Sequence, residues 1–134
     1  MICFMKSKLF VPILLAASAA AMVAQSEPPI ACNLRALTLD QRKELSAVGK
    51  RAVMAITGSR DLPDGYAFRI DPERASIRDI AEWLDLWRRC CPFYEFRIDL
   101  HGADASMWLS VTGRKGVKEY LPVDAPSLAS KLPR

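Results

Sequence analysis

The sequence predicts an α+β fold, a small sandwich of order α-β-α-β-β-α in which helices cover one face of a roughly three-stranded, mainly antiparallel sheet. Two observations support this prediction. Two segments show apolar residues at helical spacing behind capping pairs, and three short segments alternate apolar and polar residues with the period of a strand. With 134 residues, 51% of them hydrophobic and 25% charged, the chain suits one domain and excludes a multidomain enzyme or a disordered chain.

The first 26 residues predict a secretory signal peptide. Residues 1–8 carry Lys6 and Lys8 without an acidic residue, residues 9–21 are almost wholly apolar, and small residues follow at positions suited to cleavage. A bilayer span needs about 20 apolar residues, and the uncharged run here is shorter than a comfortable span. We therefore expect a cleaved leader, a periplasmic or secreted protein and no stable membrane span.

Two helices follow from capping pairs and periodicity. The first opens at the pair Thr38 and Gln41 and continues, with apolar residues at helical spacing, to an end at Gly58. The second opens behind Ser76 and covers residues 77–91, where the proline at position 92 stops it. Each helix has an apolar stripe that must be buried against another element.

Three strands are expected at residues 66–70, 94–100 and 107–112, where apolar and polar side chains alternate. A turn over residues 61–65 precedes the first strand, and a loop over residues 101–105 joins the other two as a hairpin. So few strands leave an exposed edge, which favours pairing in a homodimer or with an unknown protein partner.

The C-terminal end of the chain is expected to be a flexible tail. A turn at residues 113–116 leads into a short helix around residues 117–121, after which three prolines and little periodicity follow. The predicted organisation is therefore a signal peptide at 1–26, a single α+β domain at 27–121 and a flexible tail at 122–134.

Loss of the leader changes both the charge and the cysteine count. The whole chain has 19 basic and 15 acidic residues, and removal of Lys6 and Lys8 leaves 17 basic residues and a net charge of about +2. No stripe of Lys and Arg with interleaved aromatic residues is present, so nucleic acid is not expected as a partner. Cys3 is lost as well, and Cys32, Cys90 and Cys91 remain in an oxidising compartment.

Three segments resemble a family of small, uncharacterised bacterial proteins. They are the Arg-Arg-Cys-Cys-Pro-Phe run at 88–93 with the helix before it, the Leu-Pro-Asp-Gly-Tyr-Ala-Phe-Arg run at 62–69, and a Leu-x-x-Thr-Gly strand end at 109–113 before Gly-Val-Lys at 116–118. Trp87 departs from the pattern, which has a charged residue there. The resemblance covers about residues 31–121 and implies one domain, but it carries no activity.

The candidate chemistry lies at Cys90 and Cys91. With 100° per residue, Cys91 falls on the apolar stripe of the second helix, so we expect it to be buried and Cys90 to be partly exposed. Arg88 is expected near the edge of the same stripe, where its guanidinium would stabilise a neighbouring thiolate. The carbonyl end of the helix opposes this effect, so neither cysteine is predicted to be an activated nucleophile.

Three interpretations of the cysteines stay open. In the first, Cys32 forms a disulfide with Cys90 or Cys91. One cysteine then stays free, and we expect it to be Cys91, buried as a small apolar side chain. Alternatively, Cys90 and Cys91, together with Cys32, can bind a soft metal or metalloid such as Cu(I), Hg(II) or As(III), because adjacent thiolates suit thiophilic ions. The third interpretation is that all three are purely structural.

No established catalytic motif is present in the sequence. The single histidine, His101, falls in the predicted hairpin loop, no serine lies in a nucleophile elbow, and residues 113–116 are typical of a plain turn. We therefore predict an exported, non-enzymatic binding or interaction module with no established cofactor. The alternative is a thiol-based metal-binding or redox protein that uses Cys90 and Cys91.

Overall fold

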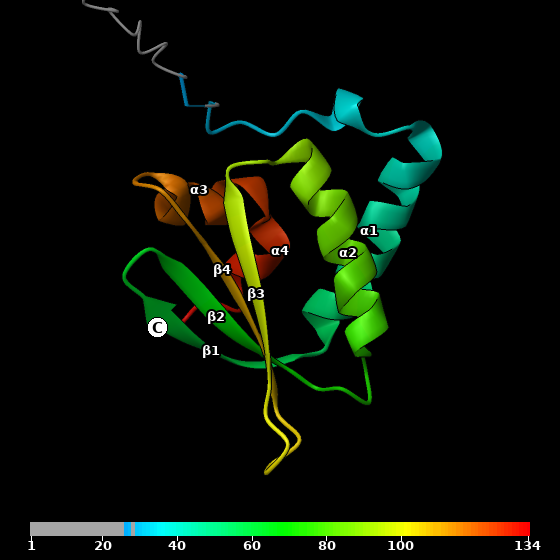
Figure 1. Cartoon of the computed structure of the whole chain (residues 1–134), viewed down its shortest axis with the longest axis vertical. Helices are drawn as coiled ribbons and strands as arrows, with labels where there is room; N and C mark the ends of the chain where they lie inside the picture. Colours follow the sequence, from blue (N-terminus) through cyan, green and yellow to red (C-terminus); the bar gives the residue numbers. More distant parts are fainter. Residues whose placement is uncertain (1–25, 28) are drawn as a thin grey trace, which may run out of the picture.

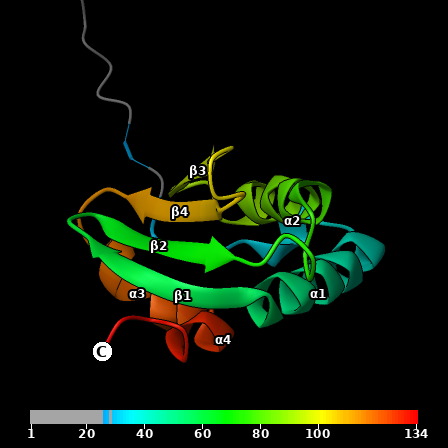
Figure 2. The same cartoon turned by 90° about the horizontal axis from the view of Figure 1, so that it is seen from below.

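The computed structural model describes residues 26, 27 and 29–134, so the predicted leader lies outside them except for its last residue. A four-stranded antiparallel sheet of order β1-β2-β4-β3 forms one layer and four α-helices form the other (Figures 1 and 2). The predicted α+β class and antiparallel sheet are confirmed, with one strand more than expected. No helix in the described part of the chain has the length and apolar character needed to cross a bilayer.

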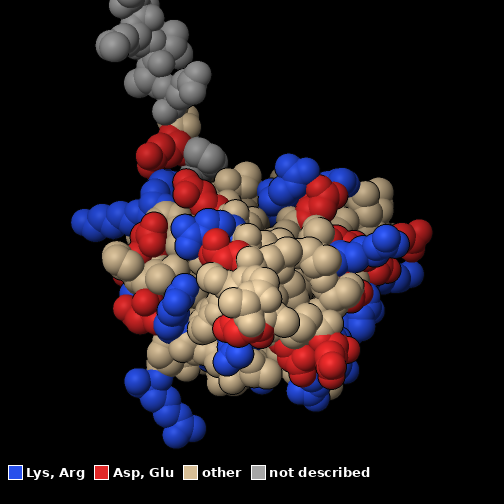
Figure 3. Space-filling model, turned by 60° about the horizontal axis from the view of Figure 1, so that its bottom comes forward, with Lys and Arg blue, Asp and Glu red and all other residues tan. Residues whose placement is uncertain are grey.

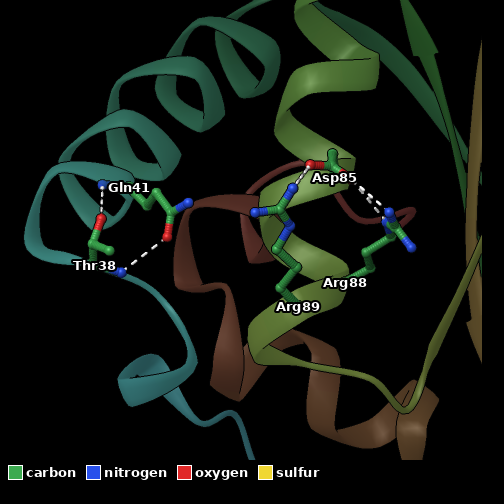
Figure 4. Close-up of polar contacts among 5 residues, drawn as sticks. All are labelled: Thr38, Gln41, Asp85, Arg88 and Arg89. Atoms are coloured by element: carbon green, nitrogen blue, oxygen red, sulfur yellow. Dashed lines mark hydrogen bonds and ion pairs between the residues drawn. The ribbon is translucent and has the colours of Figure 1, made fainter.

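The helices begin where the capping pairs predict. A short 3-10 turn, η1 (Leu34–Ala36), leads into α1 (Leu39–Met54), whose N-cap Thr38 exchanges two hydrogen bonds with Gln41 (Figure 4). Ser76 and Asp79 form the same capping box at the start of α2 (Ile77–Cys90). Each box satisfies two backbone N–H groups that a helix start otherwise leaves unpaired.

The additional strand is β1 (Ile56–Leu62), where the sequence predicts the end of the first helix and the turn after it. Helix α1 ends at Met54, and Ile56 begins a strand that pairs antiparallel with β2 (Gly65–Ile70) through the tight turn at Pro63 and Asp64. The strand was missed because Ile56 continues the helical spacing of α1, while the following Thr-Gly-Ser-Arg-Asp run has little apolar alternation.

The two central strands of the sheet, β2 and β4, contribute buried side chains to the hydrophobic core. Strand β4 (Met107–Gly113) pairs with β2 on one side and with β3 (Tyr94–Leu100) on the other. One face of the sheet is buried beneath the helices. Its side chains include Phe68, Ile70, Leu109 and Val111, each 1% exposed or less.

The opposite face of the sheet carries polar side chains. The guanidinium of Arg60 lies 4.5 Å from the ring centroid of Trp108. Arg69 of β2 is the cross-strand partner of Trp108 of β4. Basic and acidic side chains are interspersed around an uncharged centre on the side of the molecule that Figure 3 shows. Strands β1 and β3 form the two edges of the sheet, and the expected homodimer through an edge stays a prediction.

The C-terminal segment is structured rather than loose. Helix α3 (Val117–Asp124) packs on β4 and β2, and it is followed directly by α4 (Pro126–Ala129). The turn before α3 uses Gly116 at φ 96°, a left-handed conformation that favours glycine. The side chain of Leu128 is 1% exposed, so the predicted tail contributes to the core.

Candidate functional site: a pocket lined by the cysteines

A disulfide joins Cys32 and Cys91, which are 59 residues apart. Cys32 lies in the segment before η1, and Cys91 caps the end of α2. The backbone N–H of Asn33 also donates a hydrogen bond of 2.7 Å to the carbonyl of Cys90. The segment ahead of α1 is therefore held to the end of α2 by one covalent bond and one hydrogen bond.

Of the three cysteines among the described residues, Cys90 is the one outside the disulfide, and it is buried. Its side chain is only 1% exposed, which contradicts the expected partial exposure, and Cys91 rather than Cys90 forms the disulfide. Cys91 is 2% exposed, so its predicted burial is confirmed, although this residue has left the helix, with φ −128° and ψ 71°. Its side chain consequently points to Cys32 instead of continuing the apolar stripe of α2.

The three sulfur atoms lie close together. Cys90 Sγ is 3.4 Å from Cys91 Sγ, and the Cys90 thiol donates a hydrogen bond of 3.3 Å to the carbonyl of Trp87. Burial raises the pKa of Cys90, and the negative charge of Asp124 adds to the effect. The thiol of Cys90 is therefore the predominant form at neutral pH.

Asp124, at the end of α3, is the one acidic side chain among the residues that line the pocket. Its Oδ2 accepts a hydrogen bond of 3.0 Å from the hydroxyl of Tyr94 and lies 3.9 Å from Cys91 Sγ. Burial raises the pKa of Asp124, while hydrogen bonds from Tyr94 and Trp87 act against the rise. The pKa of Tyr94 is raised far above its usual value by burial and by Asp124.

These groups border a pocket of about 630 Å³ between α1, the end of α2 and the segment that contains α4. Most of its walls are apolar side chains and sulfur atoms, and its few polar groups include Asp124, Lys50 and Ser46. The size suits a small organic ligand. The residues that line it are Cys32, Leu34, Leu45, Ser46, Gly49, Lys50, Val53, Met54, Trp83, Trp87, Cys90, Cys91, Asp124, Ala125, Pro126, Ser127 and Leu128.

Two stacked indoles form one wall of the pocket. The rings of Trp83 and Trp87 are one helical turn apart on α2, with centroids 4.9 Å apart and planes 19° apart. Gly49 of α1 faces them, and a Cβ at this position would lie 2.9 Å from Trp83 Nε1. The absence of a side chain at Gly49 therefore lets α1 approach the indoles closely.

Arg88 does not support the thiols. Arg88 and Arg89 both bind the carboxylate of Asp85, at 2.6 Å and 2.5 Å, on the outer side of α2 (Figure 4). The side chain of Arg88 is 64% exposed. The expected stabilisation of a thiolate by Arg88 is consequently wrong, because an acidic residue one turn earlier on the helix holds the guanidinium away from Cys90.

A thiolate metal site would require reduction. Ligand atoms of Cys32, Cys91 and Asp124 lie within 4.8 Å of one another, and Cys90 adds a third sulfur beside Cys91. In the disulfide form, however, neither Cys32 nor Cys91 has a thiolate to offer. His101 lies exposed in the loop after β3, as expected, and takes no part in this cluster.

Neither Asp124 nor the pocket itself is predicted from the sequence. Asp124 lies in the segment that was expected to be a tail, and a single carboxylate between two prolines gives no local signal. The pocket tryptophans Trp83 and Trp87 are each 5% exposed. Comparison with protein families, with curated proteins and with solved structures finds no match to this chain. The resemblance to the bacterial family stays a prediction.

Proposed function

We propose that this protein is an exported, non-enzymatic binding module that takes a small, mainly apolar molecule into the pocket between α1, α2 and α4. The observation behind the proposal is the pocket of about 630 Å³ with predominantly apolar walls. The leader-like sequence of residues 1–26 supports export, and the disulfide between Cys32 and Cys91 is compatible with an oxidising compartment.

The carboxylate of Asp124 favours a ligand with an amino group at its end of the pocket. Asp124 offers a carboxylate next to the indoles of Trp83 and Trp87, and a cation gains from both an acidic partner and an aromatic face. Lys50 lines the same pocket without an ion pair to Asp124 among the described contacts, and its charge acts against a cation nearby. The ligand is therefore an alkyl or aryl amine whose apolar body occupies the pocket and whose amino group lies at Asp124.

A fluorescent apolar probe tests this proposal. N-phenyl-1-naphthylamine should become more fluorescent on binding, and octylamine should displace it more effectively than octanol or octanoate, which share the same alkyl chain. Ser46→Phe should weaken binding of the probe at least tenfold, because Ser46 lines the pocket. Ala47→Phe is the matched control, since Ala47 is exposed on the same helix and does not line the pocket.

Unchanged affinity in Ser46→Phe, or equal losses in both variants, would refute the proposed location. Preference for octanoate over octylamine would refute the proposed chemistry of the ligand.

A second candidate function concerns the reduced protein. Once the disulfide is opened, the thiols of Cys32, Cys90 and Cys91 lie together, and three thiolates suit As(III) or Hg(II). Mass spectrometry of the reduced protein with one equivalent of either ion should show an adduct that is lost in Cys90→Ser and in Cys91→Ser. A Cys3→Ser background removes the fourth cysteine, and an adduct that persists in both variants would exclude this candidate.

A further inference from the structure

We propose that Cys90 is the nucleophile of an internal thiol–disulfide exchange, in which it attacks Cys91 and releases Cys32. This activity goes beyond ligand binding and does not require the pocket to be occupied. It assigns a chemical role to the one free cysteine that the structure describes.

The geometry places the attacking sulfur in contact with its target. Cys90 Sγ is 3.4 Å from Cys91 Sγ, so formation of a bond of normal length requires an approach of about 1.4 Å. The Cys90 thiol donates a hydrogen bond of 3.3 Å to the carbonyl of Trp87, which holds its sulfur beside Cys91. Both side chains are buried, at 1% and 2% exposure, which shields these two sulfur atoms from competing thiols in solution.

The exchange needs no external oxidant or reductant. Cys90 loses its proton to solvent, and its sulfur forms a bond with Cys91 Sγ. The bond between Cys91 and Cys32 breaks at the same time, and Cys32 leaves as a thiolate that takes up a proton. The protein holds one disulfide and one thiol before and after the step, and only their positions change.

The two isomers differ in stability. Neighbouring Cα atoms are about 3.8 Å apart, which is shorter than the separation that most disulfides prefer. The product between Cys90 and Cys91 is therefore the minor isomer. The backbone can adopt it locally because Cys91 is already outside the helix.

Release of Cys32 changes one wall of the pocket. Cys32 and Leu34 both line the pocket, and the disulfide is the covalent link that holds their segment to α2. After exchange, the hydrogen bond from Asn33 to the carbonyl of Cys90 still connects the two segments. The sulfur of Cys32 loses its covalent link to α2 and can then move out of the pocket wall, which widens the pocket at this point.

Trapping of the released thiol tests the exchange. The full chain with Cys3→Ser is incubated with N-ethylmaleimide at pH 8 without denaturant, quenched with acid and digested with trypsin. Cleavage after Arg89 and Arg97 yields the peptide of residues 90–97, separate from the peptide that contains Cys32. We expect the label to accumulate on Cys32 while residues 90–97 carry an internal disulfide.

Cys90→Ala is the control, because it retains the disulfide between Cys32 and Cys91 and has no thiol. Labelling of Cys32 should be at least tenfold lower in this variant than in the parent chain. Circular dichroism verifies that the variant is folded, and Cys90→Ser serves as a second variant if it is not.

Label on Cys90 or on Cys91, with Cys32 still linked, would overturn the proposal. So would the absence of label in the native protein when the same chain is labelled in 6 M guanidinium chloride.

Discussion

The hydroxyl of Tyr94 donates a hydrogen bond of 3.0 Å to the carboxylate of Asp124, which is 30 residues later in the chain. This contact joins the start of β3 to the end of α3 beside the disulfide. It holds Asp124 in a partly buried position, where burial raises its pKa. The end of α3 therefore forms part of the pocket through a specific polar contact as well as through apolar packing.

The raised pKa of Asp124 predicts how stability changes with pH. Since the pKa of this carboxyl is higher in the folded than in the unfolded protein, its contribution to stability is fully present below the unfolded pKa and is lost as pH rises through the folded pKa. Asp124→Asn removes this contribution. We expect the stability of Asp124→Asn relative to the parent chain to increase as the pH rises from the unfolded pKa of this carboxyl through its higher folded pKa, and to level off above the folded pKa.

Urea unfolding at a series of pH values measures this difference. Asp85→Asn is the comparison, because Arg88 and Arg89 lower the pKa of Asp85 and so give the opposite pH trend. A difference for Asp124→Asn that does not change with pH would contradict the predicted shift.

The disulfide is expected to contribute strongly to stability. Closure of a loop of 59 residues restricts the unfolded chain, and the chain-entropy estimate for such a loop is about 4 kcal/mol. Cys32→Ala should therefore lower the free energy of unfolding by roughly this amount in urea denaturation. Leu34→Ala, an exposed position in the same segment, should change it by less than about 1 kcal/mol. Equal effects would show that packing of the segment, rather than the crosslink, stabilises the fold.

Gly49→Ala should disturb the contact between α1 and the tryptophan pair. Alanine favours a helix by about 1 kcal/mol over glycine, whereas overpacking costs roughly 1–3 kcal/mol. Because the new Cβ would lie 2.9 Å from Trp83 Nε1, we expect net destabilisation and a change in tryptophan fluorescence. Gly102→Ala, where a Cβ meets nothing within 4 Å, is the control. Stabilisation by Gly49→Ala would mean that the helices can separate at this point.

Leu128→Ala tests whether the C-terminal segment belongs to the core. The side chain is 1% exposed, so its truncation should destabilise the protein by about 2–4 kcal/mol in denaturant unfolding. Val123→Ala removes an apolar side chain that is 70% exposed and should have an effect of less than about 0.5 kcal/mol. Equal, small effects would support the flexible tail that the sequence predicts.

Local signals explain which parts of the fold the sequence predicts. The capping boxes at Thr38 and Ser76 and the alternation in β2, β3 and β4 depend on neighbouring residues, and they place these elements within a few positions. Strand β1 lacks such a signal, because its residues owe their conformation to pairing with β2. Tertiary contacts therefore determine the fourth strand.

The site is less predictable than the fold, because it too depends on tertiary contacts. The cluster of Cys32, Cys90 and Cys91 is identified from residue type, but the partner of Cys32 depends on where α2 ends. One residue decides this, since Cys90 remains in the helix and Cys91 does not. Asp124 joins the site only because its segment packs back onto the helices, which no periodicity between Pro122 and Pro126 reveals.

The three tryptophans provide the most direct test of the binding pocket. Trp83 and Trp87 line it, whereas Trp108 lies on the opposite face of the sheet beneath Arg60. In a titration of 15N-labelled protein with octylamine, followed by NMR, we expect the indole N–H signals of Trp83 and Trp87 to shift together and that of Trp108 to stay unchanged. A shift of Trp108 alone, or of none of the three signals, would contradict the account.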